Sequence, residues 1–129
     1  MALPGPGGNG PGEAMAKNAA DSPQPGGPPE ARIAVGDLVV DRDRFRVTVA
    51  HDPAPLTYME FEALYVIAEA RGRVVAYDRI AEALWGGADD DYRARLAVLV
   101  SRIRSKLGPA AQHVQNVRQV GYRLAFVPA

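Results

Sequence analysis

The cationic side chains of this chain are concentrated at its carboxyl end. Seven arginines and lysines follow Asp91 without any aspartate or glutamate, although the formal net charge of the whole chain is zero. Clustered cations of this kind suit the binding of a polyanion, because docking on phosphates releases their counterions. The alternative is that the cations only keep an exposed helix face soluble. The residues between the cations distinguish the two interpretations. The cations are Arg93, Arg95, Arg102, Arg104, Lys106, Arg118 and Arg123.

Residues that could catalyse a reaction or ligate a metal do not form a pattern. The chain has no cysteine, which excludes disulfides and thiolate metal sites. His51 and His113 lie far apart without a clustered carboxylate partner, and the run Asp89-Asp90-Asp91 is more typical of a helix start than of a magnesium site. No nucleophile, base and orienting group are recognisable together. The sequence predicts no enzyme, no cofactor, no metal and no small-molecule substrate.

Five of the seven cations following Asp91 are best placed on a helix over about residues 91–107, and Arg118 and Arg123 fall on the later hairpin. Leu96, Val100, Ile103 and Leu107 form one apolar stripe at helical spacing, with Leu99 on its flank. The opposite face is basic, small and polar, whereas a face that is only soluble would mix glutamates with the cations. The outward-facing cations are Arg95, Arg102 and Lys106.

Other elements must hold this helix in place. Alternating β-branched residues over 33–49 predict a small antiparallel sheet that ends at His51–Pro55. A capping box of Thr57 and Glu60 begins a helix that stops before Gly72, and a second helix covers about 77–85 with a poor cap at Ala76. Apolar residues over 114–126 outline a C-terminal hairpin whose tip is 118–121.

The folded domain is expected over residues 31–129. Residues 1–30 contain 14 glycines and prolines and almost no large aliphatic side chains, so they cannot bury enough apolar surface to order themselves. They are expected to form a disordered tail. This stretch has no signal-peptide pattern, and no segment is long and apolar enough to cross a bilayer. The predicted location is the cytoplasm, on the nucleoid when bound.

Five collinear segments, residues 56–61, 73–75, 84–86, 101–107 and 116–124, resemble the winged-helix effector domain of OmpR/PhoB-type response regulators. Their sequences are LTYMEF, RVV, LWG, SRIRSKL and NVRQVGYRL, and the resemblance covers about Val35 to Phe126. It implies an α+β winged helix-turn-helix with an N-terminal antiparallel sheet, three helices and a C-terminal hairpin wing. It also implies sequence-specific binding of double-stranded DNA to regulate transcription.

The resemblance also implies particular contacts. The third helix would enter the major groove, with Val98 and Arg102 facing base edges and Arg104 on a phosphate, and the wing would reach the minor groove through Arg118. Arg104 could instead pair with an acid of the first helix. The full set of implied DNA contacts is Arg95, Val98, Ser101, Arg102, Arg104, Ser105, Lys106, Asn116, Arg118 and Arg123. The loop Gly86, Gly87, Ala88, Asp89 and Asp90 corresponds to the segment that can touch RNA polymerase.

The sequence departs from the family pattern in four places and lacks a receiver domain. Ala94 replaces a usual arginine, Ala97 and Leu99 replace a usual aspartate and histidine, and Gln119 replaces the first glycine of the wing. The first hypothesis is therefore a stand-alone bacterial transcription regulator that dimerises on DNA, with about five to seven phosphate contacts and a log–log salt slope near −5 to −6. The alternative is a protein-interaction module that kept the scaffold and lost specific DNA readout.

Overall fold

The computed structural model describes residues 31–128, so the tail predicted over 1–30 lies outside the described residues. The described residues begin with an antiparallel four-stranded sheet in the order β2 (Arg32–Val35), β3 (Leu38–Asp41), β4 (Arg46–Val49) and β5 (Asp52–Pro53). The period-two pattern turns Ile33, Leu38, Val40 and Val47 into the core. The short strand β5 was not predicted, because its two exposed residues carry no alternating apolar signal.

Helix α2 (Tyr58–Ala68) begins where the capping box predicted. The Thr57 hydroxyl accepts the Glu60 N–H at 3.2 Å, and Glu60 Oε1 accepts the Thr57 N–H at 2.9 Å. Helix α3 (Tyr77–Trp85) also has the predicted bounds. Ala76 caps it without a side-chain hydrogen bond, and Gly86 ends it in the left-handed conformation at φ +78°.

Helix α4 (Tyr92–Leu107) buries the predicted apolar stripe, namely Leu96, Leu99, Val100, Ile103 and Leu107. The Asp91 side chain makes no capping bond; Asp89 Oδ1 instead accepts the Asp91 N–H at 3.1 Å. A 3₁₀ helix, η2 (Gly108–His113), continues the chain beyond Gly108. It was not predicted, since Gly108-Pro109 reads as a stop.

The C-terminal hairpin consists of β7 (Val114–Val117) and β8 (Gly121–Leu124), joined by residues 118–120. A third strand that the sequence did not reveal, β6 (Val75–Ala76), pairs with β8 directly before α3. Phe126, expected in the hairpin, lies beyond β8, where it is exposed and stacks on His113. The hairpin is therefore tied into the helical layer and does not stand free.

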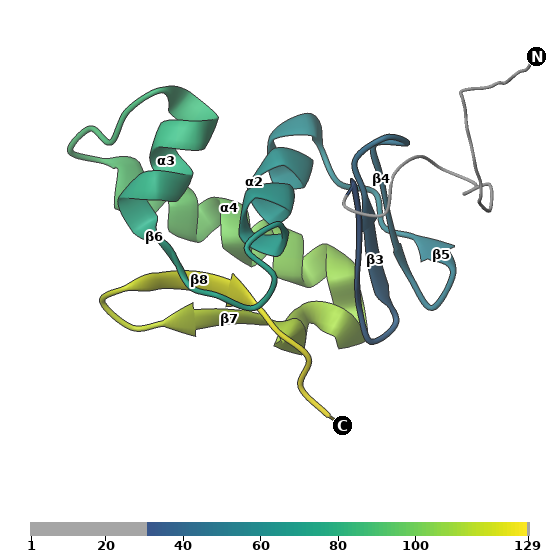
Figure 1. Ribbon diagram of the computed structural model, residues 1–129. Coiled ribbons are helices and arrows are strands. Elements are labelled where there is room, and N and C mark those ends of the chain that lie inside the picture. The colour runs from purple at the N-terminus through teal and green to yellow at the C-terminus, as the bar shows by residue number, and fades with distance from the viewer. Residues whose placement is uncertain (1–30, 129) are drawn as a thin grey trace, which may run out of the picture.

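The N-terminal sheet stands at one end of the helices, and the three-stranded sheet β6-β8-β7 runs along one side of them (Figure 1). The three helices contact one another, and the N-terminal sheet lies beside the far end of α4 from the wing tip. Phe61, Leu64, Ile80, Ile103 and Leu124 are all buried in one cluster that both sheets join. The predicted α+β winged helix is confirmed, and its core leaves one flank of α4 uncovered.

Candidate nucleic-acid interface

The uncovered flank of α4 carries the side chains expected to meet DNA. Ser101 and Arg102 are exposed, and Val98 is 49% exposed, a large fraction for an apolar residue on a helix. The Arg102 guanidinium has no hydrogen bond or ion pair to any residue of 31–128. Ser105 is also exposed, but its hydroxyl donates to the Arg102 carbonyl at 3.1 Å. Arg102 is thus the uncommitted cation at the middle of this flank.

An apolar hollow of about 380 Å³ lies along the first half of this flank. Trp85 and Leu99 form apolar walls, while Val98 and Arg102 border it on α4. Ala94 and Arg95 complete the lining. The flank therefore offers both a cation and an apolar recess.

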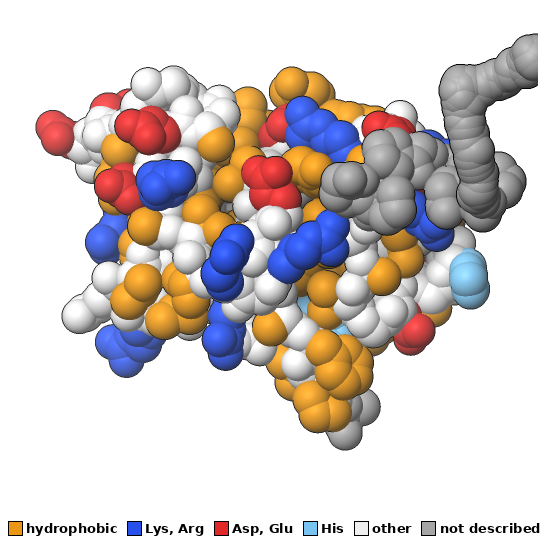
Figure 2. Space-filling view, in the orientation of Figure 1, with side chains coloured by type: hydrophobic (Ala, Val, Ile, Leu, Met, Phe, Trp, Pro, Cys, Tyr) orange, Lys and Arg blue, Asp and Glu red, His pale blue; other side chains and the backbone are white. Residues whose placement is uncertain are grey.

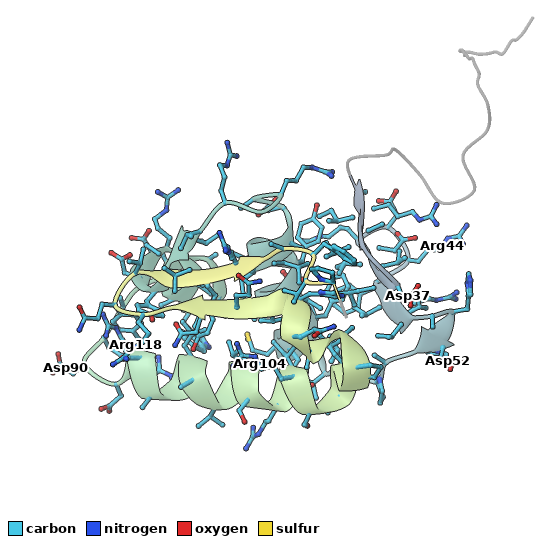
Figure 3. The ribbon with its side chains drawn as sticks, turned by 90° about the horizontal axis from the view of Figure 1, so that it is seen from below. Asp37, Arg44, Asp52, Asp90, Arg104 and Arg118 are labelled. Atoms are coloured by element: carbon cyan, nitrogen blue, oxygen red, sulfur yellow. The ribbon has the colours of Figure 1, made fainter. Side chains whose placement is uncertain are left out.

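Arg95, expected to be free, is held by its own chain. Its Nη1 lies 3.1 Å from Asp89 Oδ1, and its guanidinium stacks over the Trp85 ring at 4.6 Å from the centroid. Both side chains of the ion pair are largely exposed, so water weakens it. The loop over 86–90 is thereby tied to the first turns of α4, and its other carboxylate, Asp90, points outward at that end (Figure 3).

Arg104 is turned toward the protein. Its Nε and Nη2 donate to the Val114 carbonyl at 3.1 and 2.5 Å, joining α4 to the first strand of the wing. Figure 3 shows Arg104 between the helix and the hairpin. The partner is a backbone carbonyl and not the acid of the first helix that the sequence suggested as an alternative. This arginine is therefore a structural tie in the free protein.

Lys106, and not Arg104, pairs with an acid of the first helix. Its Nζ lies 2.7 Å from Oε1 of Glu60, whose side chain is buried in the first turn of α2. Burial raises the pKa of Glu60, but hydrogen bonds from Lys106 and Thr57 outweigh it and hold the pKa below its ordinary value. Lys106, expected to face outward, is instead paired with the Glu60 carboxylate.

The wing presents one free cation at its tip. Arg118 is exposed, has no polar partner among residues 31–128, and lies at the same end of the molecule as Asp90 and the start of α4 (Figure 3). Gln119 beside it adopts φ +67°, the left-handed conformation that favours glycine. Arg123 is half-buried, and its Nε donates to Gln115 Oε1 at 2.8 Å across the hairpin. Arg118 is therefore the wing residue best placed to reach a ligand.

One residue that the sequence did not single out belongs to this site. The Tyr77 hydroxyl donates to Oδ1 of Asn116 at 2.6 Å, and the Arg93 guanidinium stacks over the Tyr77 ring at 4.4 Å. Tyr77 is buried, at 8% exposure. Through these two contacts it joins the starts of α3 and α4 to the wing. A sequence gives no signal for a contact between residues 39 positions apart.

The face seen in Figure 2 lies on the hairpin side, where basic and acidic side chains are interspersed. In residues 31–128 no three histidines, aspartates or glutamates gather as a metal site. No helix of that part is long and apolar enough to cross a membrane.

The exposed flank of α4 and the wing tip together form the candidate nucleic-acid interface.

Comparison with protein families gives a match over most of this fold. The family model described as "Transcriptional regulatory protein, C terminal" matches residues 51–124. Response regulator ArlR of Staphylococcus epidermidis is 32% identical over 92 residues, which are 70% of this chain and 42% of that protein. This chain therefore spans about two fifths of the length of the curated relatives it matches.

Solved structures show the same arrangement of elements. The RstA DNA-binding domain of Klebsiella pneumoniae, crystallised in complex with the RstA box, is 27% identical with a TM-score of 0.65; the match covers 73% of this chain and 96% of that one. The C-terminal effector domain of BfmR from Acinetobacter baumannii is 31% identical with a TM-score of 0.60, covering 74% and 91%. Both matches therefore cover nearly three quarters of this chain and most of the compared domain.

Proposed function

Because this chain belongs to the OmpR/PhoB-type family of transcriptional regulatory C-terminal domains, we propose that it regulates transcription by reading a specific sequence in double-stranded DNA. Helix α4 enters the major groove with Val98, Ser101 and Arg102 toward the base edges, and Arg118 of the wing reaches the adjacent minor groove. One observation carries this proposal: Arg102 and Arg118 remain exposed and unpaired, while neighbouring cations are bonded within the protein.

The chemistry of the exposed set suits base readout. An arginine donates two parallel hydrogen bonds to O6 and N7 of guanine, a pairing worth about 1–3 kcal/mol of discrimination. Arg104 and Lys106 act indirectly by fixing α4 against the wing and against α2. Ser105, Asn116 and Arg123 border this set and supply hydrogen bonds to the DNA backbone. We assign Arg95 a phosphate contact that first requires its release from Asp89.

The loop over 86–90 is proposed to contact RNA polymerase. Asp90 and Ala88 are exposed there, and in the free protein the Arg95–Asp89 pair ties the loop to the first turns of α4. We further propose that two copies bind side by side on repeated half-sites, since one small domain has few contacts with which to gain affinity. A domain that acts on the bacterial chromosome works in the cytoplasm, without enzymatic activity of its own.

Selection of sites from random duplex DNA tests the proposal. We expect an enriched motif containing a guanine whose replacement costs the wild type about 1–3 kcal/mol but costs Arg102→Ala little. Arg44→Ala serves as the control, because Arg44 is exposed at the far end of the molecule from Arg118 (Figure 3). Weak retention without an enriched motif would favour the alternative, a protein-interaction module on the same scaffold.

A further inference from the structure

Tyr77 links three parts of the proposed interface at one point. Its hydroxyl donates to Asn116 Oδ1 at 2.6 Å and lies 3.3 Å from the Val117 carbonyl oxygen, both on β7. Its ring meets that of Tyr122 on β8 edge to face, with centroids 5.4 Å apart. A side chain that begins α3 is therefore packed against both strands of the wing.

The backbone of Tyr77 holds the other end of the wing turn. Its N–H donates to the Val120 carbonyl at 3.2 Å, and the Val120 N–H donates to the Val117 carbonyl at 2.9 Å. Val117 and Val120 are the two residues that flank Arg118 and Gln119. One residue thus contacts both ends of the turn that presents Arg118.

The Tyr77 ring also contacts helix α4. The Arg93 guanidinium, in the first turn of α4, lies over the ring at 4.4 Å from the centroid. The ring therefore sits between the start of α4 and the wing, and its position sets their separation. Since α4 and the wing must meet neighbouring grooves of one duplex, that separation matters for binding.

The hydroxyl also determines which atoms of Asn116 are free. An amide oxygen that accepts from Tyr77 leaves both N–H groups of the exposed Asn116 side chain as donors. Donors turned outward suit a phosphate, whereas an amide free to rotate would present its oxygen part of the time and repel one.

We propose that Tyr77 is a positioning residue that places Arg118 and the Asn116 amide against the same duplex that α4 reads. This inference rests on the proposed function for its DNA readouts. Tyr77 itself acts through the wing and makes no contact with a base. Its hydroxyl thereby contributes to the affinity for DNA. Removing the hydroxyl weakens only the contacts that the wing makes.

Tyr77→Phe tests the inference, because it removes the hydroxyl and keeps the ring against Tyr122 and Arg93. On the duplex obtained by selection we expect a 3- to 10-fold loss of affinity. Hydroxyl-radical protection of the minor groove should weaken at the wing, while protection of guanine N7 from methylation by dimethyl sulfate in the major groove persists. Tyr122→Phe is the matched control, since its hydroxyl has no hydrogen-bond partner among residues 31–128, and it should bind like the wild type.

Three results would overturn the inference. They are an unchanged affinity of Tyr77→Phe, an equal loss of both footprints, and an equal loss in Tyr122→Phe. Combining Tyr77→Phe with Asn116→Ala adds a second check: the hydroxyl effect should shrink below 2-fold when its main partner is absent. Full additivity would show that the hydroxyl does not act through the Asn116 amide, contrary to the proposal.

Amide hydrogen exchange of the free protein separates this inference from the proposed function. We expect the Val120 amide to exchange at least 5-fold faster in Tyr77→Phe than in the wild type, with the amides of α4 unchanged. Identical Val120 exchange would refute the positioning role even if the wild type bound DNA as proposed. If instead the wild type selected no site, the function would fail, and faster Val120 exchange would still support the link between Tyr77 and the wing.

Discussion

Lys106 Nζ lies 2.7 Å from Glu60 Oε1, the same oxygen that accepts the Thr57 N–H at 2.9 Å. The carboxylate that closes the capping box of α2 therefore also fastens the last turn of α4. Glu60 is buried, whereas the Lys106 side chain keeps 31% exposure. An unpaired Glu60 carboxylate therefore costs more free energy than an unpaired Lys106 ammonium, which water can reach. This contact couples the position of the DNA-binding helix to the start of α2.

Glu60→Gln should destabilise the protein by about 1–2 kcal/mol at neutral pH, because it weakens a charge-assisted hydrogen bond at a buried site. The folded-state pKa of Glu60 lies below its ordinary value of about 4.5. Its contribution is therefore complete above that value and is lost as pH falls through the folded pKa. Urea unfolding at pH 7 and between pH 5 and 3 should show the gap between wild type and variant closing on acidification.

Lys106→Met is the companion variant for this prediction. It keeps much of the side-chain length but leaves Glu60 buried without its cation, so it should cost at least as much at pH 7 and should also recover at low pH. A constant difference between wild type and Glu60→Gln from pH 7 to pH 3 would contradict the assigned role.

Gly121→Ala should prevent the wing sheet from forming as observed. An added Cβ would lie 1.9 Å from the Val75 carbonyl oxygen and 2.9 Å from the Ala76 Cα, both backbone atoms of β6 that cannot move aside. We expect a loss of about 2–3 kcal/mol or more in thermal or urea unfolding. Gly87→Ala is the control, because its added Cβ meets nothing within 4 Å, and it should be neutral or slightly stabilising.

Gln119→Gly should stabilise the free protein by on the order of 0.5 kcal/mol. A glutamine at φ +67° carries a cost of about 1–2 kcal/mol that glycine avoids, partly offset by the greater entropy of glycine in the unfolded chain. Val120→Gly in the same turn, where φ is not positive, should instead destabilise the protein. Paired urea titrations would decide, and a destabilised Gln119→Gly would show that the Gln119 side chain makes a contribution larger than the strain.

The positions of helices α2, α3 and α4 could be predicted from the sequence because each carries a local signal. The capping box at Thr57 and the apolar spacing from Leu96 to Leu107 depend on residues three or four positions apart, and both were confirmed. Strands β5 and β6 were missed because two-residue strands have no period to detect. Pairing of β6 with β8 depends on a partner more than 40 residues away.

The same reasoning explains the outcome at the site. Helical spacing indicated which face of α4 is basic, but a charge pattern does not reveal which cations find partners. Arg104 reaches a carbonyl of β7, Lys106 reaches Glu60, and Arg95 reaches Asp89; each contact is set by tertiary packing or loop geometry. The role of Tyr77 rests on contacts with Asn116 and Arg93 that only the folded chain brings together.

Internal pairing of Arg104 and Lys106 lowers the expected salt dependence of DNA binding. With about four cations left for phosphates, the log–log slope of affinity against salt should be near −3.5 per domain, shallower than the −5 to −6 expected when every cation was counted. Fluorescence anisotropy from low to physiological salt measures it. Arg118→Ala should reduce the slope by about one, whereas Arg104→Ala should leave it nearly unchanged while lowering stability. A slope near −6 would mean that Arg104 and Lys106 leave their internal partners on DNA.

Val98 should read the methyl group of a thymine. It is 49% exposed beside the apolar hollow, one helical turn from Arg102, so both side chains approach neighbouring base pairs. Replacing each thymine of the selected duplex in turn by deoxyuridine removes one methyl group, and at one position the affinity should fall about 3- to 4-fold, as expected for one buried methyl. Val98→Ala should bind the thymine and deoxyuridine duplexes almost equally. Discrimination that survives in Val98→Ala would place the methyl against another residue of the hollow, and a site indifferent to every deoxyuridine would show that Val98 does not reach the bases.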